Sequence, residues 1–151
     1  MSSGVRVIGV GNPTRGDDGV GPAVAAAVAR TVGPDVDVIV STADPSRLIE
    51  RWESAESVVL VDAMDGRAAP GRIAIFDATN EPLPSNFDEI SSHGFGVPAA
   101  VELARSLGRL PKHLVVVGIG GSEFEGIGLS PVVEDAIADA VQAVMEVIEH
   151  A

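Results

Sequence analysis

Three carboxylates and one histidine stand where their spacing allows metal chemistry. Asp17 and Asp18 close a glycine-rich loop. Asp62 ends a continuous apolar run, and His93 lies at the end of a long polar stretch. Two carboxylates and one imidazole suit a divalent metal ion with an open coordination position, so we predict a metal site of Asp18, Asp62 and His93. Each also has a structural interpretation, because an Asp often caps a turn and a lone His often lies at the surface.

The elements around these residues place two of them at one edge of a sheet. An apolar run at 5–10 predicts a strand, and a glycine-proline turn then leads to Asp18 and a helix. A second run at 58–61, typical of a strand buried on both faces, leads directly into Asp62. Parallel strands end at the same edge, which is where ligands bind in open α/β sheets. The polar stretch before His93 is long enough to bring the imidazole there.

The glycine-rich loop also raises the alternative of nucleotide binding. The dinucleotide fingerprint G-x-G-x-x-G lacks its third glycine, because Thr14 stands in that place. The phosphate loop lacks its Lys and Ser/Thr, because Asp17 and Asp18 occupy those positions and would repel a phosphate. A helix cap explains only one of the two acids. We therefore expect cation binding, with a Rossmann-like nucleotide-binding module as the weaker alternative.

The rest of the chain alternates strands with helices. Apolar patterns predict further strands at 35–40, 71–76 and 114–119, and helices at 20–32, 45–52, 94–107 and 131–148. This alternation is typical of an α/β fold, a three-layer α/β/α sandwich with a mostly parallel sheet of about five strands. The break after Gly66 suits a tight connection, so one strand can run antiparallel. No linker or repeat divides the chain, which predicts a single domain over 1–151.

Charge and composition limit the partners and the location. The chain has 22 acidic and 10 basic residues, and its net charge of −12 argues against nucleic acid and an anionic membrane surface as partners. The absence of cysteine excludes a thiolate metal site and a Cys nucleophile. No apolar run approaches the roughly 20 residues of a membrane span, and we find no signal peptide. We expect a cytoplasmic protein.

Three motifs together resemble a known family. They are Gly-Val-Gly-Asn-Pro-Thr-Arg-Gly-Asp-Asp-Gly-Val-Gly at 9–21, Val-Asp-Ala at 61–63 and Ser-Ser-His-Gly at 91–94. The combination is similar to the hydrogenase maturation proteases, endopeptidases that remove a short C-terminal extension from the large subunit of nickel–iron hydrogenases. A late Val-Gly-Ile strand and a Leu-Ser-Pro-x-Val helix start extend the resemblance over nearly the whole chain.

The resemblance implies a partner and a mechanism. The partner is a hydrogenase large-subunit precursor, and Asp18, Asp62 and His93 would bind the nickel that this precursor already carries. In isolation, another divalent metal can take its place. The docked metal would align the scissile peptide bond and polarise its carbonyl or activate a water molecule, with Asp17 or a member of the triad as general base. Asn12 would hold the loop or stabilise an oxyanion, unless it is only a turn residue.

One segment departs from the family pattern. After the second strand the family carries Asp-Gly-Gly-Thr or Asp-Gly-Gly-Ser, a motif that implies a role in positioning the substrate. Here the segment is Val40-Ser41-Thr42-Ala43-Asp44, without the glycine pair and with the acid displaced. Asp44 is the candidate for substrate binding in this segment. The departure keeps a second hypothesis open, a metal-sensing assembly factor that binds a precursor without cutting it.

Overall fold

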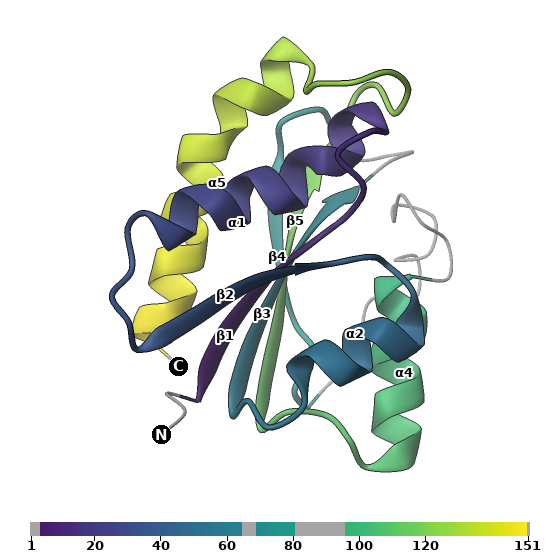
Figure 1. Cartoon of the computed structure of the whole chain (residues 1–151), viewed down its shortest axis with the longest axis vertical. Coiled ribbons are helices and arrows are strands. Elements are labelled where there is room, and N and C mark those ends of the chain that lie inside the picture. Colours follow the sequence, from purple (N-terminus) through teal and green to yellow (C-terminus); the bar gives the residue numbers. More distant parts are fainter. Residues whose placement is uncertain (1–3, 65–68, 81–95, 151) are drawn as a thin grey trace.

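A five-stranded sheet forms the centre of the molecule (Figure 1). The computed structural model describes residues 4–64, 69–80 and 96–150. The strands are β1 (Val5–Val10), β2 (Val36–Ser41), β3 (Ser57–Met64), β4 (Ile73–Asp77) and β5 (His113–Gly120). Their order is β2-β1-β3-β5-β4; the β4–β5 pair is antiparallel and the other three pairs are parallel. The predicted mostly parallel sheet with one antiparallel strand is confirmed.

The direction of β4 follows from the short connection that precedes it. Only the segment 65–72 separates β3 from β4, whereas a crossover between parallel strands needs about a dozen residues or more. Two hydrogen bonds attach the start of β4 to the end of β5. Gly71 N donates to Gly120 O at 2.7 Å, and Gly120 N donates to Arg72 O at 2.8 Å. The chain therefore returns along the outer edge of β5 in the opposite direction.

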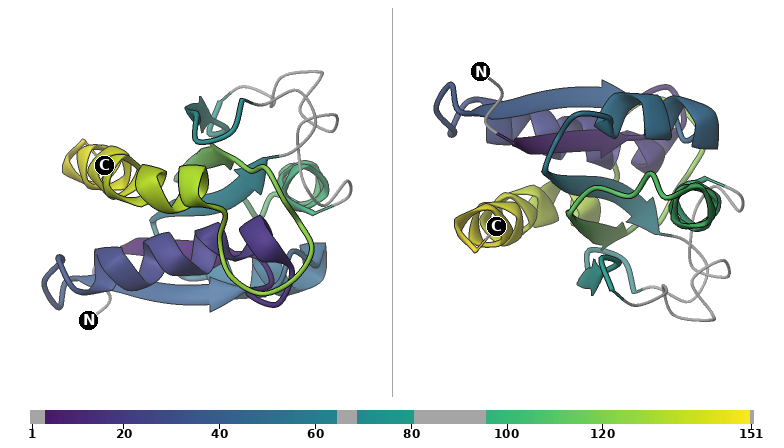
Figure 2. Two further views of the ribbon diagram at one scale, coloured as in Figure 1. Left: turned by 90° about the horizontal axis from the view of Figure 1, so that it is seen from above. Right: turned by 90° about the horizontal axis from the view of Figure 1, so that it is seen from below.

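Two pairs of helices cover the two faces of the sheet, as the two views in Figure 2 show. One face carries α1 (Val20–Ala29) and α5 (Pro131–Glu149), and the other carries α2 (Pro45–Trp52) and α4 (Val97–Leu107). Alternate side chains of β1 serve both layers: Val7 packs on the α1/α5 side, and Ile8 on the α2/α4 side. The predicted three-layer sandwich is confirmed.

Some boundaries differ from the sequence-based expectation. Helix α1 ends at Ala29 rather than at Val32, because the N–H groups of Thr31 and Val32 both donate to Val28 O and the helical ladder stops advancing. The predicted helix at 94–107 begins at Val97, because Gly96 is its N-cap and has non-helical backbone angles; residues 94 and 95 lie outside the described part of the chain. In the residues that the structure describes, no helix is long and apolar enough to cross a membrane.

Candidate functional site

Asp18 lies just beyond β1, in a short 3-10 helix, η1 (Gly16–Gly19), and is only 1% exposed. Its Oδ2 accepts a hydrogen bond from Asn12 N at 2.8 Å. Gly11 permits this tight loop, because its φ is +143° and a Cβ there would overlap the carbonyl oxygen of Asp18. Neither η1 nor α1 has a side-chain cap, so the interpretation of the acid pair as a helix cap is wrong.

Asp62 lies near the end of β3, beside the start of α1, and is 2% exposed. Its Oδ1 accepts a hydrogen bond from Ala63 N at 2.9 Å. Gly21, in the first turn of α1, packs so closely on the strand ends that a Cβ would overlap the carbonyl oxygens of Val10 and Val61. The turn that carries Asp18 therefore rests on the strand end that carries Asp62. As predicted, both carboxylates belong to the carboxyl edge of the sheet.

The third member of the predicted triad, His93, lies outside the described residues. Within 4–64, 69–80 and 96–150, no group of three His, Cys, Asp or Glu side chains could hold a metal ion. The metal triad of Asp18, Asp62 and His93 therefore stays a prediction, of which the structure describes the two carboxylates.

Asp17 points into the protein and is completely buried. Its Oδ2 accepts hydrogen bonds from Ser122 N at 2.7 Å, Glu123 N at 2.9 Å and Ser130 Oγ at 2.7 Å. Its Oδ1 accepts from Ser130 N at 2.7 Å. Burial alone would raise the pKa of Asp17, but these four hydrogen bonds to the carboxylate outweigh burial and hold the pKa below its ordinary value of 3.8.

The main-chain N–H groups of Gly16 and Asp17 donate two further hydrogen bonds to carbonyl oxygens of the loop that follows β5. Gly16 N donates to Gly126 O, and Asp17 N donates to Glu123 O, both at 2.7 Å. The loop 121–130 is thereby attached to η1 through donors and acceptors on both sides. We call this set of contacts the Asp17 clamp. The sequence patterns do not predict the clamp or the part that Ser130 plays in it.

A pocket of about 460 Å³ opens beside Asp18, between the β1–η1 loop and the connection from β2 to α2. Its lining residues are Gly11, Asn12, Pro13, Arg15, Asp18, Thr42 and Ala43. Gly11 N donates to Ser41 O at 3.1 Å, which holds the two loops together. The segment that departs from the family pattern therefore forms one wall of the pocket.

A family model for hydrogenase maturation proteases (HycI) matches residues 22–147, most of the chain. The chain belongs to the hydrogenase maturation protease family. It is therefore a peptidase by family membership, as the three motifs predict. The match to the family model begins after the Asp17–Asp18 pair, so the loop that precedes α1 is compared through the relatives.

Three similar proteins match nearly the whole chain. The hydrogenase expression/formation protein HupD of Bradyrhizobium diazoefficiens is 30% identical over 148 residues, which are 95% of this chain and 77% of HupD. The hydrogenase maturating endopeptidase HybD of E. coli has a TM-score of 0.79 and 25% identity, over 99% of this protease and 93% of HybD. A hydrogenase 2 maturation peptidase of a Thaumarchaeota archaeon has a TM-score of 0.70 and 27% identity, over 96% and 97% of the two chains.

Of two further predicted residues in this maturation protease, Asn12 lines the pocket and Asp44 follows the lining residue Ala43. Asn12 Oδ1 accepts from Thr14 N at 2.9 Å and from Thr14 Oγ1 at 2.7 Å, an Asx turn that leaves Nδ2 as the donor of this side chain. Asp44 is the N-cap of α2, and its Oδ2 accepts from Arg47 N at 3.0 Å. Asp44 does not line the pocket. Its role in substrate binding stays a prediction, beside the capping role that the structure describes.

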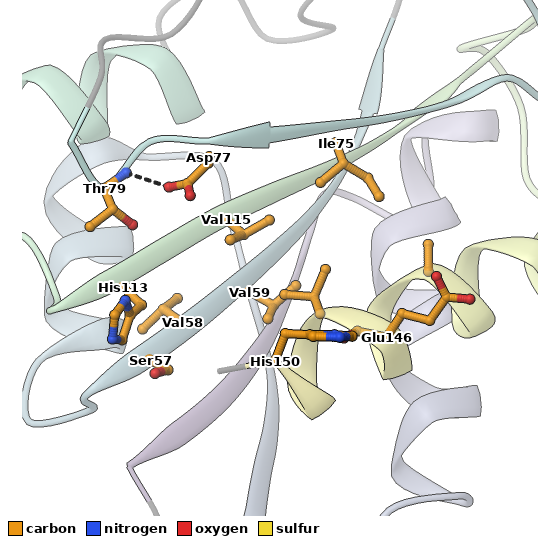
Figure 3. A pocket seen from close by; sticks show the side chains of 12 residues that line it. Ser57, Val58, Val59, Ile75, Asp77, Thr79, His113, Val115, Glu146 and His150 are labelled. Carbon is orange, nitrogen blue, oxygen red and sulfur yellow. Dashed lines mark hydrogen bonds between the residues drawn. The ribbon is translucent and has the colours of Figure 1, made fainter.

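A second pocket, of about 390 Å³, lies at the opposite end of the sheet (Figure 3). Ser57 and His113, which begin β3 and β5, line it together with His150 near the end of α5. His150 Nδ1 lies 2.7 Å from the carbonyl oxygen of Glu146. Because Asp62 lies near the far end of β3, the two histidines of this pocket are remote from the acidic edge of the protease.

Proposed function

We propose that this chain is the endopeptidase that removes the C-terminal extension of a nickel-loaded hydrogenase large-subunit precursor. In this proposal Asp18, Asp62 and His93 dock on the nickel of the substrate. The observation that carries the proposal is the placement of two buried carboxylates at neighbouring strand ends, 1% and 2% exposed. Each carboxylate is oriented by a main-chain N–H, and carboxylate oxygens are ligands that suit a divalent metal cation.

The nickel brought by the precursor would act as a Lewis acid, which either polarises the scissile carbonyl or lowers the pKa of a water molecule. The chain supplies orientation. Asn12 N holds Asp18 Oδ2, and Ala63 N holds Asp62 Oδ1, so each carboxylate is set in direction before the substrate arrives. The side-chain amide of Asn12, at the mouth of the pocket, donates to the oxyanion that forms during peptide cleavage.

The general base in this proposal is a carboxylate of the triad, and Asp17 is a positioning residue. Both oxygens of Asp17 accept hydrogen bonds, four in all, and its pKa is lowered. A carboxylate in that state is a weak proton acceptor. Asp18 and Asp62 belong to the same sheet edge, and a carboxylate oxygen of the triad that does not bind the nickel would accept the proton of the attacking water.

The experiment is cleavage of the nickel-loaded precursor, followed by mass spectrometry. We expect the wild type to shorten the precursor, and Asp18→Asn, Asp62→Asn and His93→Ala to leave it intact while keeping the wild-type melting temperature. Asp139→Asn, on the exposed face of α5, is the matched control and should cleave normally. Cleavage by all three triad variants would refute the proposed triad.

The departure at Ser41–Asp44 supports a second candidate, an assembly factor that senses nickel without cutting. Thr42 and Ala43 stand in the wall of the pocket, and Asp44 is used as a helix cap. The same assay separates the two candidates. Nickel-dependent binding of the precursor that never produces a shortened chain would favour the sensor over the endopeptidase.

A further inference from the structure

Arg15 is held rigidly at the edge of the acidic pocket. Its N–H donates to Asn12 O at 3.0 Å, and its carbonyl oxygen accepts from Asp18 N at 3.1 Å. The next residue, Gly16, is anchored to Gly126 by the Asp17 clamp. The backbone of Arg15 is thus hydrogen-bonded to Asn12 on one side and to Asp18 on the other. The side chain of Arg15 is exposed and lines the pocket.

The guanidinium of Arg15 has no partner among the described residues. Elsewhere in the described chain, Arg6, Arg105, Arg109 and Lys112 each form an ion pair with an acidic side chain. Arg15 forms neither an ion pair nor a side-chain hydrogen bond there, although acidic residues outnumber basic ones 22 to 10 in the whole chain. Other arginines also form no ion pair with a described residue; among the described residues, Arg15 is the cation that lines the pocket beside Asp18.

The pocket therefore combines two kinds of polar group. Asp18 contributes a carboxylate, which accepts hydrogen bonds. Arg15 and the side-chain amide of Asn12 contribute hydrogen-bond donors. The apolar part of the lining comes from Pro13 and Ala43. A volume of about 460 Å³ accommodates an extended peptide segment of a few residues. A guanidinium donates through a planar fork of N–H groups that matches carboxylates and carbonyl oxygens.

We infer that Arg15 binds an acceptor oxygen of the precursor segment next to the scissile bond, either a main-chain carbonyl or a carboxylate. This inference rests on the proposed function for the identity of the substrate. Because the side chain is exposed in the free protein, its contact forms on substrate binding and acts before the chemical step. Arg15 is then a specificity residue that lowers KM, and it is distinct from the triad that acts on the peptide bond.

The test compares Arg15→Ala and Arg15→Lys with the wild type. The control is Arg30→Ala, an exposed arginine at the other end of α1. For nickel-loaded precursor, we expect Arg15→Ala to raise KM about tenfold and to change kcat less than about threefold, since the lost interaction is a hydrogen bond to a charged group. Arg30→Ala should match the wild type in both constants.

Affinity for nickel-free precursor is the second readout, because it does not depend on cleavage. Arg15→Ala should weaken this affinity by a similar factor. If the partner is a carboxylate, the loss of affinity caused by Arg15→Ala should shrink steeply with added salt, and Arg15→Lys should keep much of the wild-type affinity. A main-chain carbonyl predicts little dependence on salt and poor rescue by Lys.

Failure of the inference and failure of the proposed function give different results. A wild type that cleaves normally, with Arg15→Ala equal to it in KM and in affinity, overturns the role of Arg15 alone. A drop in kcat at constant KM also overturns it, because the contact would then belong to the transition state. If the wild type binds precursor without cleaving it, while Arg15→Ala binds more weakly, the protease proposal fails and the role of Arg15 stands.

Discussion

The carboxylate of Asp17 accepts hydrogen bonds from both the main-chain N–H and the hydroxyl of Ser130, a residue 113 positions further along the chain. The two contacts, each 2.7 Å long, join the loop before α1 to the loop before α5. Asp18 is the next residue after Asp17. The direction of the candidate metal ligand therefore depends on a contact made from the last quarter of the chain.

Loss of the Asp17 carboxylate should destabilise the whole protein. We expect Asp17→Asn to lower the free energy of unfolding by about 2–4 kcal/mol, because buried donors lose a charged acceptor. Ser130→Ala, which removes one of the four hydrogen bonds, should cost about 1 kcal/mol. Urea unfolding measures both changes, and exposed Asp139→Asn should stay within about 0.5 kcal/mol of the wild type. A wild-type midpoint for Asp17→Asn would contradict the clamp.

The same carboxylate should make stability depend on acidity in a defined direction. The pKa of Asp17 in the folded protein lies below its ordinary value of 3.8, so folding favours the charged form. The contribution of Asp17 to the free energy of unfolding is fully present above the pKa of the unfolded state. It is lost as pH falls through the pKa of the folded state. We expect the stability difference between wild type and Asp17→Asn to be constant near neutral pH and to shrink below pH 3.8. If the stability difference between the two proteins grew as pH falls, the prediction would be contradicted, because the pKa of Asp17 would then be raised by folding.

Gly11 should tolerate no side chain. A Cβ at this position would overlap Asp18 O, and the φ of +143° is strained for any L residue with a side chain. We expect Gly11→Ala to displace Asp18 and to lower kcat/KM for the precursor at least about a hundredfold, because catalytic groups must be held within a fraction of an ångström. Gly33→Ala is the matched control, because nothing lies within 4 Å of its added Cβ. Equal activity of the two variants would show that the loop is adaptable.

Asp44 offers a test of capping against substrate binding. If its role is to cap α2 through Arg47 N, Asp44→Ala should lower stability by about 1 kcal/mol and leave KM for the precursor unchanged. Asp44→Ser should restore the stability, because a serine hydroxyl also caps a helix. Thermal unfolding and steady-state kinetics measure the two effects separately. A higher KM in both variants would instead support the predicted substrate contact.

The sheet edge that holds Asp18 and Asp62 could be predicted from sequence because local patterns define it. An apolar strand followed by a turn and a helix specifies a parallel unit. Asp18 lies in the turn after β1, and Asp62 lies near the end of β3. The partners of Asp17 could not be predicted in the same way. Ser122, Glu123 and Ser130 lie 105 to 113 residues from it, and three of the four hydrogen bonds come from main-chain N–H groups, which leave no signature in residue type.

One signal for the clamp was present in the sequence. Ser130 stands directly before Pro131, a pattern that predicts the start of a helix. The helix start is correct. The oxygen of the serine hydroxyl accepts no bond from the first turn of α5, and its O–H donates to Asp17. A buried carboxylate outcompetes a main-chain carbonyl or water as the acceptor for this hydroxyl, because hydrogen bonds to ionised groups are stronger. The local sequence pattern predicts where the helix starts, but the hydrogen-bond partner of Ser130 depends on the tertiary structure.

The link between Asp17 and Ser130 also determines when, during synthesis, the site can come into being. A ribosome makes Asp17 and Asp18 first, but the donors that hold Asp17 follow β5, which must itself insert between β3 and β4. Contacts between such distant parts of a chain form late in folding. A nascent chain that still lacks residue 130 therefore carries the acid pair without its supports. We therefore expect the acid pair to reach its final orientation only after residue 130 has been synthesised and β5 has joined the sheet.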